Sequence, residues 1–366
     1  MQEMLPAQAA SAWVSEVHAL VPNVNRATLE SFVSPKLTVH SYSQTRGSPV
    51  GLARLAVATM RLLLRVRPDI LHVHATVAGL VARLCAGVLW PRPKIVYCPH
   101  GWLFNQNGVS RRSKPVIRMV ERLLGRVSDA IVCVSEHERR CAVSAGLPAG
   151  KCILVRNGVS DFPGPLPADE CPHVTEGRLR VLYVGRFDID KGFDTYLEAM
   201  RRLGNAAEGY AVGAYVTDKQ KQPAIPQNVI VRGWCDRDAL RTIYEQSSVL
   251  VVPSRAEAFG LVALEAMRSG LPVFCTRTGG LPELVLDGVT GRCFDADDVD
   301  GLLALLRGTS PAALRRYGRE GRVRFVQHFT AGIMNRNMLE QYFELIAHGA
   351  AKELSSPTGS AATGAM

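Results

Sequence analysis

Two glutamates, Glu257 and Glu265, flank a short and mostly apolar segment of the chain. The apolar run Val249–Val252 before them predicts a buried strand, and the residues from about Phe259 onward predict a helix. Glu257 is then expected in the loop at the carboxyl end of the strand. Glu265 is expected about two turns into the helix. Two carboxylates placed this way can contact one ligand.

The start of this helix is itself a candidate binding element. Backbone N–H groups at a helix N-terminus lack intrahelical partners and carry partial positive charge, which favours a phosphate. Here these groups belong to Phe259, Gly260 and Leu261. A phosphate site with a carboxylate on each side for hydroxyl groups has the shape of a sugar nucleotide. The alternative is an ordinary strand–helix junction with two solvated glutamates.

A second loop, about seventy residues earlier, carries two cations. The apolar strand Val181–Val184 breaks at Gly185 into a loop that holds Arg186 and Lys191. Arg offers a planar fork of donors and Lys a compact charge, so the pair suits a diphosphate. Taken alone, such a loop is usually just solvated, but together with the two glutamates it favours a phosphate site.

Paired glycines follow the helix at Gly279 and Gly280, before Pro282 at a short helix. With these motifs in this order, the chain resembles the retaining glycosyltransferases of family 4, which have the GT-B fold. The resemblance covers roughly residues 68–346 and is strongest over 180–294.

The resemblance implies roles for individual residues. Glu265 would hold the ribose hydroxyls, Glu257 would lie against the transferred sugar, and Arg186 and Lys191 would bind the diphosphate, with Gly185 beside them. His100, in a Cys-Pro-His-Gly segment after a predicted strand, would face the donor sugar. The family also places backbone contacts to the nucleotide base near Gly233 and Trp234, although Trp234 can equally be a core aromatic.

The fold class expected is α/β, because apolar strands alternate with helical periods. Strands are predicted in the N-terminal half at 37–42, 69–74, 94–98, 130–134 and 152–155. The resemblance implies a GT-B fold, in which two Rossmann-like, doubly wound domains face a central cleft and the C-terminal helix crosses back to the first domain. The predicted boundaries are 1–165 for the acceptor-side domain, 166–330 for the nucleotide-sugar domain, 331–349 for the returning helix and 350–366 for a disordered tail.

Two segments do not fit the alternation of strands and helices: a candidate linker in the middle of the chain and the N-terminus. Residues 157–177 are rich in Pro, Gly and acidic residues and are predicted to form an interdomain linker. Members of the family open with a strand and a Gly-rich loop, and nothing before Gln8 reads as that strand. We therefore expect the chain to be short at its N-terminus, and a version extended upstream to gain soluble yield or activity.

The charge is unevenly divided. Residues 1–165 hold 20 Lys and Arg against 9 Asp and Glu, whereas residues 166–366 hold 23 against 24. The basic residues concentrate in 54–67 and in Arg111–Arg126, both interleaved with apolar residues, as in helices that lie on an anionic membrane. The alternative is that each helix packs its apolar face on the sheet. Nucleic acid is not expected, because stacking aromatics and nucleic-acid motifs are lacking.

Composition indicates a cytoplasmic protein, peripheral to the membrane at most. The 366 residues include no run of about twenty apolar residues and no signal peptide. Nine scattered cysteines show the paired spacing of neither a zinc site nor a redox motif, so no metal centre is predicted from them.

The function expected is metal-independent transfer of a hexosyl group from a nucleotide sugar to a glycan or lipid-linked acceptor, as in surface polysaccharide or glycolipid biosynthesis. The resemblance implies that the transfer retains the anomeric configuration. No cofactor is expected. The Asp-x-Asp spacing of Asp188 and Asp190 could hold a metal, but it lies between two cations that already suit the phosphates. Two alternatives stay open: a sugar-nucleotide epimerase of the same architecture, and a degenerate sugar-nucleotide-binding protein.

Overall fold

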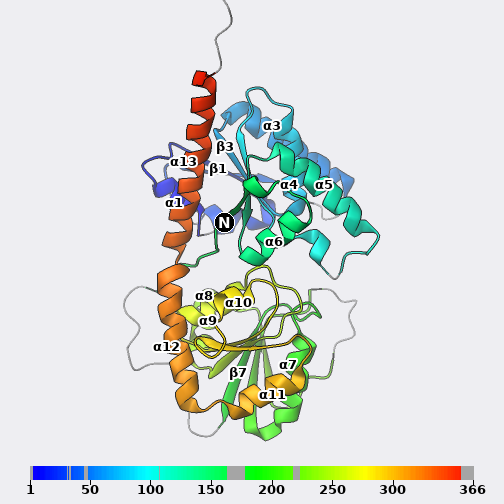
Figure 1. Cartoon of the computed structure of the whole chain (residues 1–366), viewed down its shortest axis with the longest axis vertical. Coiled ribbons are helices and arrows are strands. Elements are labelled where there is room, and N and C mark those ends of the chain that lie inside the picture. Colours follow the sequence, from blue (N-terminus) through cyan, green and yellow to red (C-terminus); the bar gives the residue numbers. More distant parts are fainter. Residues whose placement is uncertain are drawn as a thin grey trace, which may run out of the picture. The chain divides into compact units, whose positions relative to one another are not determined.

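The computed structural model describes residues 3–30, 32, 34–44, 48–106, 108–162, 178–216 and 223–355. The chain divides into two compact units, coloured along the sequence in Figure 1. The first unit comprises Met1–Cys98, Leu123–Ile131 and Asn335–Met366, and the second comprises Pro99–Arg122 and Val132–Met334.

In the described residues the strands are β1 (Val17–Pro22), β2 (Leu37–Tyr42), β3 (Ile70–His74), β4 (Lys94–Cys98), β5 (Ala130–Cys133), β6 (Cys152–Leu154), β7 (Leu179–Val184), β8 (Ala207–Val212), β9 (Val229–Gly233), β10 (Val249–Val252), β11 (Val273–Thr276) and β12 (Gly291–Phe294). The helices are α1 (Leu5–Ala10), α2 (Arg26–Glu30), α3 (Pro49–Val66), α4 (Thr76–Gly87), α5 (Ser113–Val127), α6 (Glu136–Ser144), α7 (Phe193–Leu203), α8 (Arg237–Glu245), α9 (Leu261–Arg268), α10 (Leu281–Leu284), α11 (Val299–Gly308), α12 (Pro311–His328) and α13 (Ala331–Ser355).

The second unit is built on a parallel sheet. Its described strands follow the order β12-β11-β10-β7-β8-β9, and every neighbouring pair is parallel. β10 and β11 are buried at every position, as expected for strands whose two faces are both covered by helices. α7 packs with α11, and α9 packs with α12. Because β7, β10 and β11 are adjacent and parallel, the loops that follow them meet at one edge of the sheet.

The first unit holds β1, β2, β3, β4 and the start of β5. β1 pairs with β2 in parallel, and the four-stranded sheet of the described residues has the order β3-β4-β5-β6. The sequence prediction missed β1, because its apolar run is short, His18 interrupts the run, and Pro22 ends it. α1 covers this pair, with Leu5 packed among Ala19, Val21 and Leu29.

The last helix, α13, begins at Ala331 in the second unit and continues in the first unit from Asn335. There the Asn335 side chain donates to the Glu3 carbonyl at 2.9 Å, and Gln8 donates to the Tyr342 hydroxyl at 3.0 Å. α13 extends to Ser355, past the predicted start of the tail at 350. The remaining residues of that predicted tail lie outside the described residues.

The described part of the predicted linker, up to Phe162, is anchored to the second unit, so the linker prediction is wrong for it. Val159 forms a bridge with Thr330, and the Asp161 carboxylate accepts from both terminal nitrogens of Arg322. The Phe162 ring lies between the guanidinium groups of Arg241 and Arg268, each 4.1 Å from the ring centroid. These contacts are distant in sequence, so local composition gave no sign of them. Residues 163–177 lie outside the described residues.

Candidate active site

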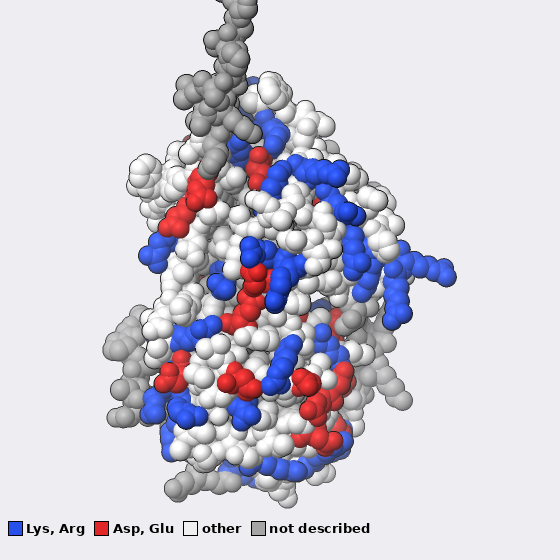
Figure 2. Space-filling view, in the orientation of Figure 1, with Lys and Arg blue, Asp and Glu red and all other residues white. Residues whose placement is uncertain are grey.

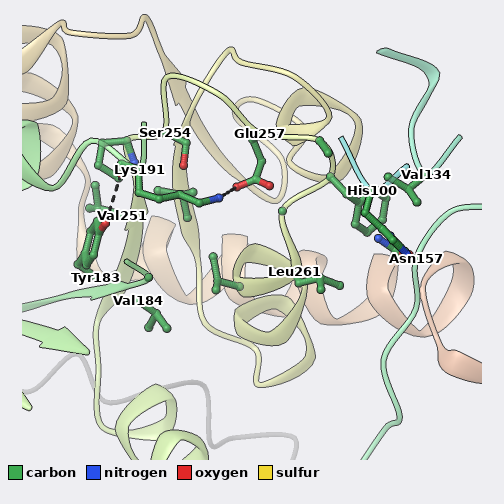
Figure 3. Close-up of a pocket in the computed structure, with 17 residues that line it drawn as sticks. His100, Val134, Asn157, Tyr183, Val184, Lys191, Val251, Ser254, Glu257 and Leu261 are labelled. Atoms are coloured by element: carbon green, nitrogen blue, oxygen red, sulfur yellow. Dashed lines mark hydrogen bonds and ion pairs between the residues drawn. The ribbon is translucent and has the colours of Figure 1, made fainter. Parts of the chain in front are cut away.

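A pocket opens in the second unit at the carboxyl ends of β7 and β10 (Figure 3). Its volume is about 320 Å³. Its walls come from the loops after β4, β5, β6, β7 and β10 and from the start of α9. The residues that line the pocket include His100, Val134, Asn157, Tyr183, Gly185, Lys191, Ser254, Glu257, Ala258, Phe259, Gly260 and Leu261. Ligands of open parallel α/β sheets bind at this edge.

An ion pair stands in the wall of this pocket. The Lys191 Nζ lies 2.7 Å from the Glu257 Oε2, and the two side chains are 27% and 12% exposed (Figure 3). The pair joins the loop after β7 to the loop after β10. Charges this enclosed act on a bound ligand through a lower effective dielectric than water provides. Both residues were predicted as site residues, but not as partners.

Two glycines, one in the loop after β7 and one in the loop after β11, approach the backbone of the loop after β10 closely. Gly192 has φ +66°, and a Cβ there would lie 2.0 Å from the carbonyl oxygen of Pro253. Gly279 has φ +61°, and a Cβ there would lie 1.6 Å from the carbonyl oxygen of Glu257. Any other residue would collide with backbone and would also adopt an unfavourable left-handed conformation. The glycine loops predicted from the sequence therefore set the position of the backbone beside the ion pair.

Arg186, the other predicted phosphate cation, does not line the pocket. Its guanidinium pairs with Asp188 at 3.1 Å, and its side chain is 49% exposed. Asp188 also accepts the backbone N–H of Lys191 at 2.8 Å, while the Tyr183 hydroxyl donates to the Arg186 carbonyl at 2.7 Å. Asp188 therefore organises the loop that carries both predicted cations.

Arg255 is a structural residue of the site that the sequence prediction did not include. Its guanidinium makes a two-point contact with the Asp194 carboxylate at 2.7 and 2.8 Å and donates to the Ile189 carbonyl at 2.6 Å. Its backbone N–H donates to the Asp190 carbonyl at 2.8 Å. The hydrogen bonds to Asp194 raise the pKa of Arg255. Arg255 thus clamps the loop of Glu257 to the loop after β7.

His100 lies on the loop after β4 and lines the pocket together with Val134 and Asn157, which Figure 3 shows grouped with it. Its φ of +54° and the φ of +110° at Gly101 place two consecutive residues in the left-handed region. Asn157 was missed as a site residue, because it stands at the start of the segment predicted as a linker. The Asn-Gly pair predicts a turn directly after the strand at 152–155. A turn at the carboxyl edge of a parallel sheet is a common place for a site residue, so this pattern could have identified Asn157.

The helix that carries Glu265 begins at Leu261, two residues later than predicted, because Gly260 at φ +107° forms its N-cap. Phe259, Gly260 and Leu261 all line the pocket, but because the helix begins at Leu261, its free N–H groups start at Leu261 and not at Phe259 as predicted. Glu265 therefore lies about one turn into α9. Its carboxylate accepts from the buried Tyr244 hydroxyl at 3.2 Å, and it does not line the pocket.

Gly233 and Trp234, predicted near the nucleotide base, lie at and just after the end of β9 and outside the pocket lining. Gly233 has φ +64°. The Trp234 side chain is 62% exposed, which rules out the alternative that it is a core aromatic. Its role in base binding stays a prediction.

These features define a class of protein: an α/β protein with a partly polar pocket at the carboxyl edge of a parallel sheet. Comparison with known families gives two matches. The model for glycosyl transferases group 1 matches residues 172–309, and the model for glycosyltransferase family 4 matches residues 7–161. The chain belongs to the group 1 glycosyltransferases and has their GT-B fold, as its sequence motifs predicted.

Individual relatives agree with this assignment. The chain is 28% identical over 273 residues to an uncharacterized 41.2 kDa protein in the cps region of Klebsiella pneumoniae, covering 72% of this chain and 76% of that protein. It is 28% identical over 280 residues to a glycogen synthase of Mycobacterium tuberculosis, covering 72% of this chain but 66% of that enzyme. HepE of Anabaena, solved with UDP-glucose, shares the fold at a TM-score of 0.73 and 16% identity, covering 94% of both chains. The epimerase alternative finds no support among these matches.

Proposed function

We propose that this glycosyltransferase moves a hexosyl group from a nucleotide sugar to a glycan or lipid-linked acceptor, with retention of anomeric configuration and without a metal ion. The observation that supports this most directly is the enclosed Lys191–Glu257 pair in a pocket beside the start of α9. The pair places a cation for phosphate and a carboxylate for sugar hydroxyls within one site.

The bond that breaks releases a nucleoside diphosphate, on which negative charge grows in the transition state. Lys191 and the helix start at Gly260 and Leu261 would stabilise that charge, and Arg186 would add to it on turning inward from its surface position. An enclosed pocket strengthens this effect relative to water. Glu257 would orient the sugar, and the departing phosphate would help to deprotonate the acceptor.

Metal independence is supported by the partners of the Asp-x-Asp segment. Asp188 is already paired with Arg186 and with the Lys191 backbone. A divalent cation bound to Asp188 would have to displace these contacts, and it would stand beside two cations.

Nucleotide binding is the first test. UDP, GDP and ADP are each added to the purified chain, and the thermal midpoint is compared with that of the chain alone. We expect one of them, with UDP the first candidate given the HepE complex, to raise the midpoint by mass action. Glu265→Ala should abolish most of that shift, whereas Glu245→Ala, which removes a half-buried glutamate of α8 that pairs with Arg241, should leave it unchanged.

No shift with any nucleotide, in a chain that unfolds cooperatively, would contradict the proposed donor site. A shift without any release of nucleoside diphosphate from the matching nucleotide sugar, even with acceptor present, would favour the degenerate binding protein instead.

The acceptor side of the proposal concerns the surface of α5. Val116, Met119 and Leu123 form a stripe along this helix and are 64%, 55% and 52% exposed. Arg112 directly precedes α5 and Arg118, Arg122 and Arg126 lie within it, and Figure 2 shows Lys and Arg gathered over α5 and its neighbours. Within the described residues, none of the helices has the length and apolar character needed to cross a membrane. An exposed apolar stripe bordered by cations fits the surface of an anionic membrane, where a lipid-linked acceptor would be found.

This surface is tested by co-sedimentation with vesicles of phosphatidylcholine containing about a quarter phosphatidylglycerol. We expect binding to fall at least about fivefold when Val116, Met119 and Leu123 are all changed to Ser, because each loses apolar area inserted into the interface. Val323→Ser with Val326→Ser, on the similarly exposed face of α12, is the matched control. Equal losses in both variants, or equal binding to pure phosphatidylcholine, would contradict the role of α5.

A further inference from the structure

Glu138, a buried residue in the first turn of α6, has no part in the chemistry proposed above. It is 2% exposed. Its Oε1 accepts the backbone N–H of Gly101 at 2.6 Å, and its Oε2 accepts the backbone N–H of Val134 at 2.7 Å. A carboxyl group is costly to bury unless it is hydrogen-bonded, and here each of its oxygens is engaged by a different loop.

Both of these loops carry residues of the pocket wall. His100 directly precedes Gly101, and His100 and Val134 line the pocket (Figure 3). The indole N–H of Trp102 also donates to the backbone carbonyl of Glu138, at 3.0 Å. The turn that presents His100 is therefore fastened to α6 at two points, one through the Glu138 carboxyl group and one through its carbonyl.

The backbone of this turn requires such a restraint. His100 has φ +54° and Gly101 has φ +110°. A residue with a side chain seldom adopts the left-handed region, and it persists there only where the surroundings hold it. The Gly101 N–H directly follows the strained residue His100. The hydrogen bond to Glu138 therefore restrains the backbone next to the unfavourable conformation.

The same turn of α6 reaches the other catalytic loop. The Ser135 hydroxyl caps α6 by accepting the N–H of Glu138 at 3.1 Å and donates to the carbonyl of Ala258 at 2.7 Å. Ala258 follows Glu257 and lines the pocket. The start of α6 therefore sets the position of His100 relative to the loop of Glu257.

We infer that Glu138 is a positioning residue, which fixes His100 in the pocket wall at the distance from Glu257 that sugar transfer requires. Its effect on turnover rests on the proposed function, but its hold on His100 does not. Burial raises the pKa of Glu138 to about 7, against the opposing effect of the two backbone hydrogen bonds. The carboxyl group is thus retained despite a cost of burial, which is consistent with a specific task.

The test compares Glu138→Gln with Glu136→Gln. The first variant keeps the shape of the side chain but replaces one acceptor oxygen with an NH₂ group that faces an N–H donor. The second changes a neighbouring glutamate of α6 whose side chain pairs with Arg139 at the surface, and it serves as the matched control.

The first readout needs no substrate. Spectra of the full chain labelled with ¹⁵N-histidine are recorded without ligand, and the His100 signals are identified by their absence in His100→Asn. We expect Glu138→Gln to move the His100 ring signals and to leave those of His18 and His40 in place, and Glu136→Gln to leave all three unchanged. Unchanged His100 signals in Glu138→Gln would overturn the inference.

The second readout is turnover of the nucleotide sugar selected by the thermal screen. We expect Glu138→Gln to lower kcat at least about tenfold, while the donor KM and the nucleoside diphosphate Kd stay within about threefold of the wild-type values. A loss of nucleotide binding in parallel with kcat would indicate a purely structural role and would overturn the inference. A wild-type chain without transfer activity would contradict the proposed function, and the histidine spectra would still decide the role of Glu138.

Discussion

Replacing Lys191 with alanine is expected to lower kcat/KM for the nucleotide sugar by about 10²- to 10³-fold, the effect seen when one preorganised donor to a developing anion is removed. Lys191 is the cation that lines the pocket at the carboxyl end of β7, and its side chain is 27% exposed. A charge in this position stabilises the departing diphosphate more strongly than a fully solvated one would.

The change has a second consequence, because Lys191 is paired with Glu257 at 2.7 Å. Without Lys191, the Glu257 carboxylate would stand unpaired in the pocket, where it would repel a diphosphate. Binding of the nucleoside diphosphate should therefore weaken as well as turnover. Arg186 cannot replace the lost cation in place, since its guanidinium pairs with Asp188 outside the pocket lining.

Titration calorimetry with the nucleoside diphosphate and steady-state kinetics with its sugar ester measure both effects. Lys191→Arg should recover part of the activity because it keeps the charge. Lys151→Ala, which removes a lysine outside the pocket lining, should behave as wild type. If Lys191→Ala binds the nucleotide as tightly as Lys151→Ala does, Lys191 is not the diphosphate cation.

The parts of the site that the sequence predicted are those encoded by short segments. Lys191 and Glu257 were identified because each lies in a loop directly after a buried strand, and strands covered on both faces read as continuous apolar runs. The loop of Lys191 also carries Gly192, and Gly279 lies in the loop after β11, where its conformation lets that loop approach the backbone of Glu257. Local order in the sequence was enough to predict that both loops belong to one site.

The supporting residues could not be predicted in this way, because their roles depend on partners distant in the sequence. Arg255 contacts Asp194, and Glu138 contacts Gly101. The tertiary fold brings these residues together, and no local sequence pattern predicts the contacts. The pairing of Lys191 with Glu257 was missed for the same reason. Among the strands, β1 was missed because its apolar pattern is interrupted, whereas β7 and β10 were predicted from continuous apolar runs, which lie in the core of the second unit.

Replacing Glu257 with alanine should separate binding from turnover, because its carboxylate competes with the diphosphate for Lys191. In this structure Lys191 is held by Glu257. A donor must exchange that ion pair for one with its own phosphates, and the exchange costs part of the binding energy. Without Glu257 the lysine is available from the start, so the nucleoside diphosphate should bind as tightly as to the wild type or a few times more tightly.

Turnover should change in the opposite direction. The Glu257 carboxylate, at the carboxyl end of β10, is the acidic group of the pocket that can orient sugar hydroxyls beside the breaking bond, and we expect its loss to lower kcat about 10²-fold or more. Glu257→Gln should lose less kcat, because its amide still hydrogen-bonds to hydroxyls. The nucleotide Kd and kcat are measured for both variants alongside Glu245→Ala. A weakened nucleotide Kd in Glu257→Ala would show that the carboxylate supports Lys191 instead of competing with its ligand, since only competition makes binding and turnover change in opposite directions.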